Sequence, residues 1–419
     1  MCRYGKNLTH LQQVLLFKDS NWDAFMEILL VNNQLQYGGA ETVVHQLRSR
    51  IPNTRLLVPE SPSLSAEVMY PRLLSRLNHS RLHNLIEKLL PMSDWTNRRF
   101  AKVQNDPADI VHIHNFHGTY ASIETLAGLI ALKRVVWTFH GLWGVTGGCD
   151  HPKGCAGYLH ACGHCPQLGL WPIGEVDRTA EELSRKTAAL AGLAVNVIAP
   201  SRYFYDTIRS SQVGKGWNVY HIPNGVDPNG FAPAQTKSHR IKVLIVNRNF
   251  QDPHKGFGVV LEALNLANPP GVELSFAGLN SGWAIAQLRK AYRTRDLGYI
   301  MDRKRMAQLY GESHIFLFAS PAENFPCVIL EAMASGCCVV ATPSGGVVEQ
   351  IADGENGFLA ENISGNALAA ALDRALKEPA NIAAIGENAR QTVIKEFSEV
   401  RMIEAHLRLY QSLMENGAF

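Results

Sequence analysis

Short apolar runs alternate with amphipathic stretches along most of this chain. The first run, EILLVNN, begins near Met26, and QYGGAETVVHQL follows it as a glycine loop that opens a helical pattern. Apolar runs of about four to eight residues between turn residues are typical of buried strands, whereas apolar positions three or four apart indicate helices. Repeated strand–helix alternation predicts an α/β protein with parallel sheets.

The alternation falls into two successive series. In the first series, strands are expected at residues 54–60, 109–115, 134–140 and 196–201, with a helix starting near Tyr203. In the second series, strands are expected at 241–247, 272–278, 297–300, 314–320 and 337–342, and helices at 255–268, 282–293, 302–312, 326–335 and 345–352. A last amphipathic helix, VRMIEAHLRLYQSL, follows these elements.

The two series predict two Rossmann-like, doubly wound domains. The turn residues of PNGVD and the polar stretch PAQTKSHR separate the series. We expect an extension over 1–25, an N-terminal acceptor domain over 26–222 with a cysteine-rich insert at 147–169, and a C-terminal donor domain over 223–398. The helix at 399–419 should pack back on the N-terminal domain. Parallel sheets bind ligands at the carboxyl ends of their strands, so two such domains facing each other predict a cleft.

Composition narrows the class of protein. Hydrophobic residues make up 46% and charged residues 18% of the 419 residues, which is ordinary for a globular protein. The formal net charge of +3 is too small to indicate nucleic-acid binding. No apolar run approaches the roughly 20 residues of a membrane span, and the first residues lack the pattern of a secretory signal. We therefore expect a cytoplasmic protein without a nucleic-acid partner.

Two carboxylates stand out in SPAENFPCVILEAMASGCCVVATPSGG, which starts at Ser320. Glu323 lies in a polar loop after a buried strand, and Glu331 lies eight residues later in a helix that begins near Pro326. The start of that helix offers free N–H groups and a positive dipole to an anion. Carboxylates beside such a phosphate site suit sugar hydroxyls. A glutamate of this kind, taken alone, is more often a solvated loop residue or a capped helix residue than a ligand-binding one.

The order of these motifs resembles the retaining glycosyltransferases of family 4, which have the GT-B fold. The glycine loop YGGAE, the PNGVD segment, the lysine of DPHKGF and the E-x7-E block occur in the order typical of that family. The resemblance extends over most of the chain from Met26. It implies transfer of a sugar from a nucleotide-diphosphate sugar to a glycan or lipid-linked acceptor.

The resemblance also implies roles for individual residues of the second half. Glu331 binds the ribose hydroxyls of the nucleotide, and Glu323 contacts the donor sugar. The backbone N–H groups near Asn324 and Phe325 hold sugar and phosphate. Lys255 neutralises the diphosphate leaving group, which suits a compact ammonium. Arg248 is the candidate for a second basic residue, although the loop between Arg248 and Lys255 is longer than is usual in the family.

In the first half, the resemblance places Gly38 and Gly39 over the donor phosphate and His140 beside the reacting groups. A glycine pair between a strand and a helix lets backbone approach a phosphate closely, but it is also common in tight turns. His140 ends the strand RVVWTFH and precedes Gly141. A structural hydrogen-bonding role for this histidine stays open.

Retention requires either a covalent intermediate or departure of the leaving group and attack of the acceptor on the same face of the sugar, and the resemblance implies the second route. In the family, the leaving phosphate itself helps to deprotonate the acceptor. The protein then contributes positioning and electrostatic stabilisation. No Asp-x-Asp cluster suggests a divalent metal at the nucleotide, so we expect catalysis without a cofactor.

The insert TGGCDHPKGCAGYLHACGHCPQLG carries four cysteines in the spacing C-x5-C-x6-C-x2-C. Cys149, Cys155, Cys162 and Cys165 could hold one structural zinc ion, because four thiolates close a tetrahedral site. In a reducing compartment, metal binding is favoured over two disulfides, and four packed thiols remain the alternative. Similar inserts in some exopolysaccharide enzymes of the colanic-acid type suggest a role in surface polysaccharide assembly.

The segment from Tyr70 to Lys102 is basic and rich in leucine. An amphipathic basic helix suits peripheral contact with the anionic inner face of the cytoplasmic membrane, where a lipid-linked acceptor would lie. A solvated helix over the core is the alternative.

Two rival functions remain. One is a nucleotide-sugar 2-epimerase on the same architecture, which would convert the donor without an acceptor. The other is a zinc-stabilised binding protein with a degenerate site. The E-x7-E block argues against the first, and the presence of Lys255, Glu323 and Glu331 argues against the second.

Overall fold

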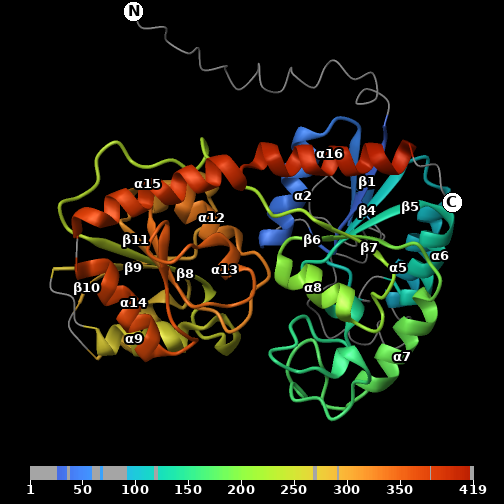
Figure 1. Cartoon of the computed structure of the whole chain (residues 1–419), viewed down its shortest axis with the longest axis horizontal. Coiled ribbons are helices and arrows are strands. Elements are labelled where there is room, and N and C mark those ends of the chain that lie inside the picture. The colour runs from blue at the N-terminus through green and yellow to red at the C-terminus, as the bar shows by residue number, and fades with distance from the viewer. Residues whose placement is uncertain are drawn as a thin grey trace, which may run out of the picture. The chain divides into compact units, whose positions relative to one another are not determined.

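The computed structural model describes residues 26–34, 38–58, 67–68, 92–117, 121–267, 271–289, 292–377 and 379–415 (Figure 1). The expected extension 1–25 lies outside them. Contacts group the chain into two compact units. The first comprises 1–138, 192–196 and 406–419, and the second comprises 139–191 and 197–405. Among the described helices, none is long and apolar enough to cross a membrane.

Buried parallel strands form the centre of the first unit. Its elements are β1 (Ile28–Val31), α2 (Gly39–Arg50), β2 (Thr54–Val58), β3 (Glu67–Val68), α5 (Met92–Ala101), η1 (Lys102–Asn105), β4 (Ile110–His114), α6 (Ile123–Leu132) and β5 (Arg134–Thr138). Strand β1 pairs in parallel with β2 and with β4, and all residues of β1 and β4 are buried. Burial on both faces explains why these strands are continuous apolar runs in the sequence.

A buried polar cluster joins β4 to the last helix, α16 (Glu399–Glu415). Tyr410 Oη lies 2.6 Å from His112 Nδ1, and Thr138 Oγ1 lies 2.7 Å from His112 Nε2. The rings of His112 and His406 lie 5.7 Å apart. The C-terminal part of α16 from His406 therefore belongs to the first unit.

The second unit contains the rest of the chain. Its elements are η2 (Trp143–Val145), η3 (Gly157–Leu159), α7 (Thr179–Leu190), β6 (Asn196–Ala199), α8 (Arg202–Ser210), β7 (Asn218–His221), β8 (Lys242–Asn249), η4 (Pro253–Lys255), α9 (Phe257–Leu266), β9 (Glu273–Leu279), α10 (Ser281–Ala286), β10 (Arg293–Gly298), α11 (Arg303–Glu312), β11 (Ile315–Phe318), α12 (Cys327–Ala334), β12 (Cys338–Ala341), α13 (Val347–Gln350), β13 (Gly357–Leu359), α14 (Gly365–Lys377) and α15 (Pro379–Glu396). Residue Asn196 of β6 is grouped with the first unit, and α16 is divided at His406.

Two sheets are seen in the described part of the chain. One has seven strands in the order β3-β2-β1-β4-β5-β6-β7, and the other has six in the order β10-β9-β8-β11-β12-β13. The pairings of β8 with β9 and β11, and of β12 with β11 and β13, are parallel. This confirms the predicted α/β class with two parallel, Rossmann-like sheets.

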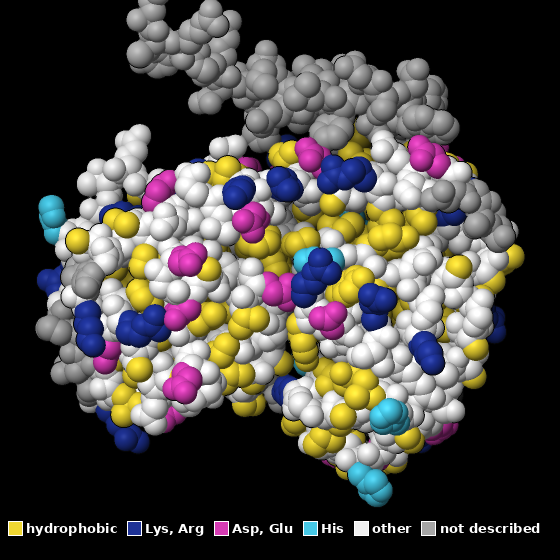
Figure 2. Space-filling view, viewed as in Figure 1, with side chains coloured by type: hydrophobic (Ala, Val, Ile, Leu, Met, Phe, Trp, Pro, Cys, Tyr) yellow, Lys and Arg dark blue, Asp and Glu magenta, His cyan; other side chains and the backbone are white. Residues whose placement is uncertain are grey.

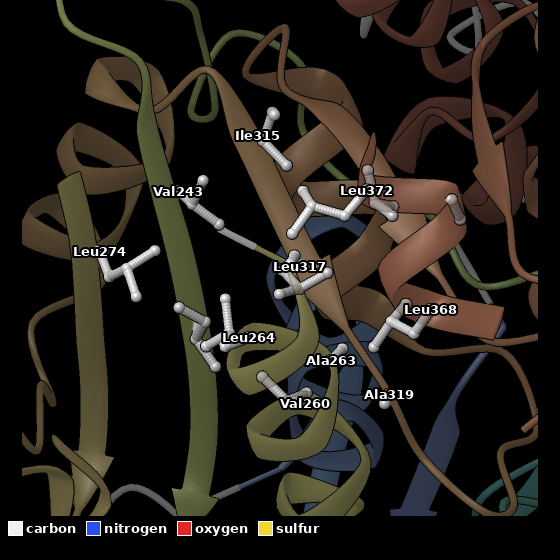
Figure 3. Close-up of a cluster of buried hydrophobic side chains, with 14 of the residues drawn as sticks. Val243, Val260, Ala263, Leu264, Leu274, Ile315, Leu317, Ala319, Leu368 and Leu372 are labelled. Carbon is white, nitrogen blue, oxygen red and sulfur yellow. The ribbon is translucent and has the colours of Figure 1, made fainter. Parts of the chain in front are cut away.

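One of the two hydrophobic cores of the six-stranded sheet lies under α9 and α14. Val260 and Leu264 of α9 and Leu368 of α14 point toward the sheet in Figure 3, where Ile315 and Leu317 of β11 meet them. All of these side chains are buried. Their close packing holds β11 rigidly, and the loop that follows β11 therefore starts from a fixed point.

The helix predicted at 282–293 is shorter than expected, and the strand predicted at 297–300 begins earlier. The helix α10 ends at Ala286, and Arg293–Gly298 form the edge strand β10. This strand is polar, and its Arg293 Nε lies 2.9 Å from a carboxylate oxygen of Glu273 on β9. An edge strand that faces solvent lacks the apolar pattern of an interior strand, and charged residues are common on such edges.

Charged side chains of both signs are scattered over the face of the protein that Figure 2 shows. On the face shown in Figure 2, basic and acidic groups are interspersed with apolar ones. The mixed distribution agrees with the small net charge of the sequence.

Candidate functional site

The loop at residues 319–326 connects β11 to α12 in the second unit. Glu323 lies in this loop, and Pro326 is the N-cap of α12 with extended backbone. Within the described residues, the backbone N–H groups of Asn324 and Phe325 have no hydrogen-bond acceptor. Unsatisfied N–H groups before a helix start, together with the helix dipole, form a site for an anion.

The side chain of Asn324 holds this loop in place. Its Nδ2 donates to the backbone oxygen of Phe139 at 2.9 Å, and its Oδ1 accepts from Ser201 Oγ at 2.8 Å. Asn224 of the PNGVD segment donates to the backbone oxygen of Phe325 at 2.8 Å. The two asparagine side chains thus position the backbone of the loop, which leaves its N–H groups for a ligand.

Two glycines allow a second turn to approach the loop. A Cβ added at Gly345 would lie 1.7 Å from the backbone oxygen of Glu323, and one at Gly346 would lie 2.1 Å from that of Asn324. Gly345 also has φ +51°, a left-handed value that favours glycine. The backbone N–H of Gly346 donates to the oxygen of Asn324 at 2.8 Å. Only glycine fits at these two positions without displacing the loop.

Lys255 ends the short helix η4 and is exposed. Its backbone oxygen accepts from Asn247 Nδ2 at 3.0 Å, and the next residue, Gly256, has φ +69°. A Cβ at Gly256 would lie 2.3 Å from the backbone oxygen of Ala319. The lysine turn is therefore packed directly against the end of β11.

Lys255 and Glu323 influence each other electrostatically. Burial raises the pKa of Glu323 above its ordinary value, while the ammonium of Lys255 and a hydrogen bond from Ser320 lower it. The Lys255 charge also acts on the pKa of His151, which burial lowers to about 4. The structure thus places Lys255 within electrostatic range of both the 319–326 loop and the cysteine-rich insert.

Glu331 lies on α12 and is half-buried. Burial raises its pKa to about 7, and the guanidinium of Arg303 lowers it. Arg303 begins α11, where its guanidinium lies 5.2 Å from the centre of the Phe231 ring. A half-buried carboxylate that faces a single cation can accept hydrogen bonds from a hydroxyl-bearing ligand.

The other candidate residues are distributed as follows. His140 follows Phe139, whose backbone oxygen is held by Asn324. Arg248 is exposed near the end of β8. Gly38 and Gly39 belong to the first unit, where Gly38 is the N-cap of α2. A Cβ at Gly38 would lie 2.4 Å from Glu41 Oε2, so the backbone turn there closes over a buried carboxylate.

The cysteine-rich insert follows His140. The backbone N–H of Leu142 donates to the oxygen of Asp150 at 2.8 Å, and a Cβ at Gly141 would lie 2.7 Å from Asp150 Oδ1. Among the described residues, no three His, Cys, Asp or Glu side chains are grouped as a ready metal site. The zinc site expected in this insert therefore stays a prediction.

The basic segment predicted to contact a membrane lies mostly outside the described residues. Arg98 and Arg99 are in the last turn of α5, and Lys102 begins η1. The membrane contact stays a prediction.

Sequence reasoning missed several residues that shape the site. Ser201, Arg303, Gly345 and Gly346 act on Asn324, Glu331 and the 319–326 loop. The glycine pair in ATPSGG was a usable signal, since consecutive glycines often mark close approach of two backbones. Ser201 and Arg303 carried no local signal.

Solved structures share this architecture along nearly the whole chain. Sucrose-phosphate synthase from Thermosynechococcus elongatus matches with a TM-score of 0.68 and 20% identity, covering 94% of this chain and all of that one (100%). HepE of Anabaena in complex with UDP-glucose matches with a TM-score of 0.64 and 18% identity, covering 92% and 100%. A likeness at this identity concerns the fold alone, which is the GT-B architecture predicted from the sequence.

Family models match both halves of the chain. Residues 37–229 match Glycosyltransferase Family 4, and residues 231–392 match Glycosyl transferases group 1. This chain belongs to these glycosyltransferases.

Two curated relatives agree with the family. The putative colanic acid biosynthesis glycosyl transferase WcaC of Escherichia coli K12 is 24% identical over 252 residues, which are 56% of this chain and 60% of WcaC. N-acetyl-alpha-D-glucosaminyl L-malate synthase of Bacillus anthracis is 27% identical over 177 residues, which are 42% of this chain and 46% of that protein. The matched region thus spans only 46% to 60% of the length of these two relatives.

Proposed function

We propose that this protein transfers a hexose from a nucleotide-diphosphate sugar to a glycan or lipid-linked oligosaccharide, with retention of configuration, in bacterial surface polysaccharide assembly. The observation that supports this most directly is the arrangement of Lys255, Glu323 and Glu331 about the start of α12. Lys255 lowers the pKa of Glu323, and Glu331 lies on the helix itself. A cation, an anion-binding backbone and two carboxylates together suit a diphosphate with hydroxyl-rich groups on either side.

The proposed roles follow from charge and position. The ammonium of Lys255 and the N–H groups of Asn324 and Phe325 neutralise the diphosphate as it leaves. Glu323 accepts hydrogen bonds from the hydroxyls of the donor sugar, and Glu331 accepts those of the ribose. His140 directly follows Phe139, whose backbone oxygen Asn324 holds, and we assign it to the reacting sugar.

In the transfer step, the bond between the sugar's anomeric carbon and the diphosphate oxygen breaks. A bond from the acceptor hydroxyl oxygen forms on the same face of that carbon, and the hydroxyl proton passes to the departing phosphate oxygen. The protein supplies position and charge, and no covalent intermediate is needed. We propose that this step requires no cofactor.

The names of the relatives support the substrate class. HepE was solved with UDP-glucose, and WcaC is named for colanic acid biosynthesis. The proposal extends this to a donor nucleotide and a glycan acceptor for the present chain. The identity of the base, the sugar and the acceptor is left to experiment.

The first test is binding of UDP, GDP, ADP and their common sugar conjugates, measured by thermal shift on the full chain. A ligand present at about 100 times its dissociation constant should stabilise the protein by about 2.7 kcal/mol. The preferred conjugate is then incubated with lipid-linked oligosaccharide extracts, and products are followed by mass spectrometry. Transfer that needs an acceptor supports the proposal. Conversion of the donor without an acceptor indicates an epimerase, and binding without any turnover indicates a binding protein.

Matched variants test the site assignment. Glu323→Gln and Lys255→Ala should abolish most of the transfer while leaving the fold intact, because both side chains lie at a loop or turn. Lys377→Ala, an exposed lysine on α14, serves as the control. Unchanged transfer rates in Glu323→Gln and Lys255→Ala would show that the site is assigned wrongly.

A further inference from the structure

The cysteine-rich insert brings four thiol side chains around one small cavity. Cys149, Cys155, Cys162 and Cys165 all line it. The four are partly exposed and free of disulfides in the structure. Their positions in the sequence are 16 residues apart at most, yet they come from separate turns of the insert. Local chain geometry, and not a shared helix, therefore brings them together.

The sulfur atoms of Cys155 and Cys162 both lie close to Gly157. A Cβ added at Gly157 would lie 3.4 Å from Cys162 Sγ and 3.5 Å from Cys155 Sγ. The backbone N–H of Gly157 also donates to Cys155 Sγ at 3.4 Å. A Cβ at Gly147 would lie 2.9 Å from Cys162 Cβ. The two glycines leave room for the cysteines to approach one another, and an N–H···S hydrogen bond stabilises a thiolate that binds a metal.

A buried cation lies beside the cluster. Lys186 on α7 is fully buried (0% exposed), and its Nζ donates to the backbone oxygens of Trp143 at 2.7 Å and Thr146 at 3.0 Å. No ion pair is found for this lysine within the described residues, although it lies within electrostatic range of Cys149 and Cys162. Burial lowers the pKa of Lys186 to about 7, while the carboxylate of Glu182 raises it and the centre of the Trp143 ring lies 3.5 Å from its Nζ, so the charge is only partly compensated. Four thiolates around one Zn²⁺ carry a net charge of −2, which would compensate it.

We propose that Cys149, Cys155, Cys162 and Cys165 bind one Zn²⁺ as a closed, tetrahedral structural site. Binding displaces the four thiol protons and leaves four Zn–S bonds. The thiols are not gathered at bonding distance in the described structure. Metal binding would therefore have to draw together four thiols that already line one cavity.

The proposed zinc site is linked through Asp150 to the region around His140. Asp150 follows the first ligand directly and is held against Gly141 and Leu142, next to His140. A metal bound at Cys149 would thereby fix the start of the insert against the residues that follow His140. This consequence rests on the proposed function, whereas metal binding itself does not.

The test is the metal content of the full chain, purified from cells grown with added zinc and measured by plasma mass spectrometry. We expect one zinc per chain. Cys155→Ser and Cys162→Ser should lose it, whereas Cys338→Ala, which removes a buried core thiol outside the cluster, should retain it. Metal well below one per chain, or metal retained in both serine variants, overturns the proposal.

Cobalt provides a second measurement that does not depend on the variants folding. Co²⁺ added to metal-free wild-type protein should give the intense thiolate-to-cobalt charge-transfer band and the visible d–d bands of a tetrahedral site. Absence of these bands, or disulfides among the four cysteines in protein kept under reducing conditions, overturns the proposal. Both measurements are independent of sugar transfer, so a failure of the proposed function leaves their outcome unaffected.

Discussion

The side-chain amide of Asn324 donates a hydrogen bond to the backbone oxygen of Phe139, 2.9 Å away. The two residues are 185 positions apart in the sequence. The bond fastens the loop that carries Glu323 to the residue that precedes His140. The same amide accepts from Ser201. Its role is therefore to position the two candidate groups, and we expect substitutions at Asn324 to affect the chemistry more than ordinary buried substitutions do.

Asn324→Ala should lower kcat by on the order of 10²-fold, because a displacement of about 1 Å at reacting groups can cost this much. It should also lower the free energy of unfolding by about 1–3 kcal/mol for the buried partners left unsatisfied. Asn356→Ala is the matched control, since Asn356 is buried and bonded to Gln350 and Thr392 elsewhere in the unit. Steady-state kinetics and denaturant unfolding should show similar destabilisation but a normal kcat in the control. Equal kcat values in the two variants would contradict the positioning role.

Lys255→Ala should reduce kcat by on the order of 10²–10³-fold, as expected when one group that stabilises a leaving anion is removed. The substitution should also raise the pKa of Glu323 further, because Lys255 lowers it in the wild-type protein. A pH–rate profile measured for both proteins would show an acid limb shifted to higher pH in the variant. Lys377→Ala should behave as wild type. An acid limb that stays in place would mean that Glu323 does not titrate in the measured step.

Donor binding should depend on the protonation of Glu331. Its pKa is raised to about 7, and the carboxylate form accepts hydrogen bonds from two ribose hydroxyls. The dissociation constant for the donor should therefore increase as the pH falls below 7. Glu331→Gln should bind more weakly at pH 8 and lose this dependence. Calorimetric titrations at several pH values measure it, and a wild-type affinity independent of pH between 6 and 8 would refute the assignment.

The raised pKa of Glu331 also makes the free energy of unfolding depend on pH. As the pH rises, donor binding should become stronger, whereas the stability of the ligand-free protein should fall. Because the pKa of Glu331 in the folded protein is higher than its ordinary value of 4.5, its contribution to stability is fully present below pH 4.5. That contribution is lost as the pH rises to about 7. The neutral Glu331→Gln variant should thus gain stability relative to the wild-type protein between these two pH values. Urea unfolding across this range, without ligand, measures the difference.

Gly345→Ala should disrupt the site far more than Gly354→Ala. Both glycines have positive φ, +51° and +79°, so each alanine costs about 1–2 kcal/mol of backbone strain. Only the Cβ at Gly345 would meet a backbone atom, the oxygen of Glu323 at 1.7 Å, whereas at Gly354 the nearest atom is an Arg374 nitrogen at 4.0 Å. Donor affinity and kcat should fall in Gly345→Ala and stay normal in Gly354→Ala. Comparable kinetics in the two would contradict the importance of this contact.

The sequence by itself determined the architecture and predicted where the candidate site lies. Parallel strands buried on both faces must be apolar along their whole length, so β4 and β11 were evident without coordinates. The 319–326 loop was found because turn chemistry, a helix start and two carboxylates fall within one short stretch. The polar edge strand β10 was placed wrongly, because solvent exposure removes the apolar signal. The short strands β7 and β13 and the helices α14 and α15 were not predicted.

The tertiary structure decided which side chains act on that loop. Asn324 reaches Phe139, Lys255 acts on Glu323, and Arg303 acts on Glu331. Each of these pairs joins residues from separate elements, and each depends on how helices and loops pack around a sheet. Hydrophobic periodicity specifies the face that an element buries, but it does not specify which polar groups of two elements will meet. Contacts between such groups form only when the chain folds. They determine the hydrogen bonds and the electrostatic environment of the candidate site.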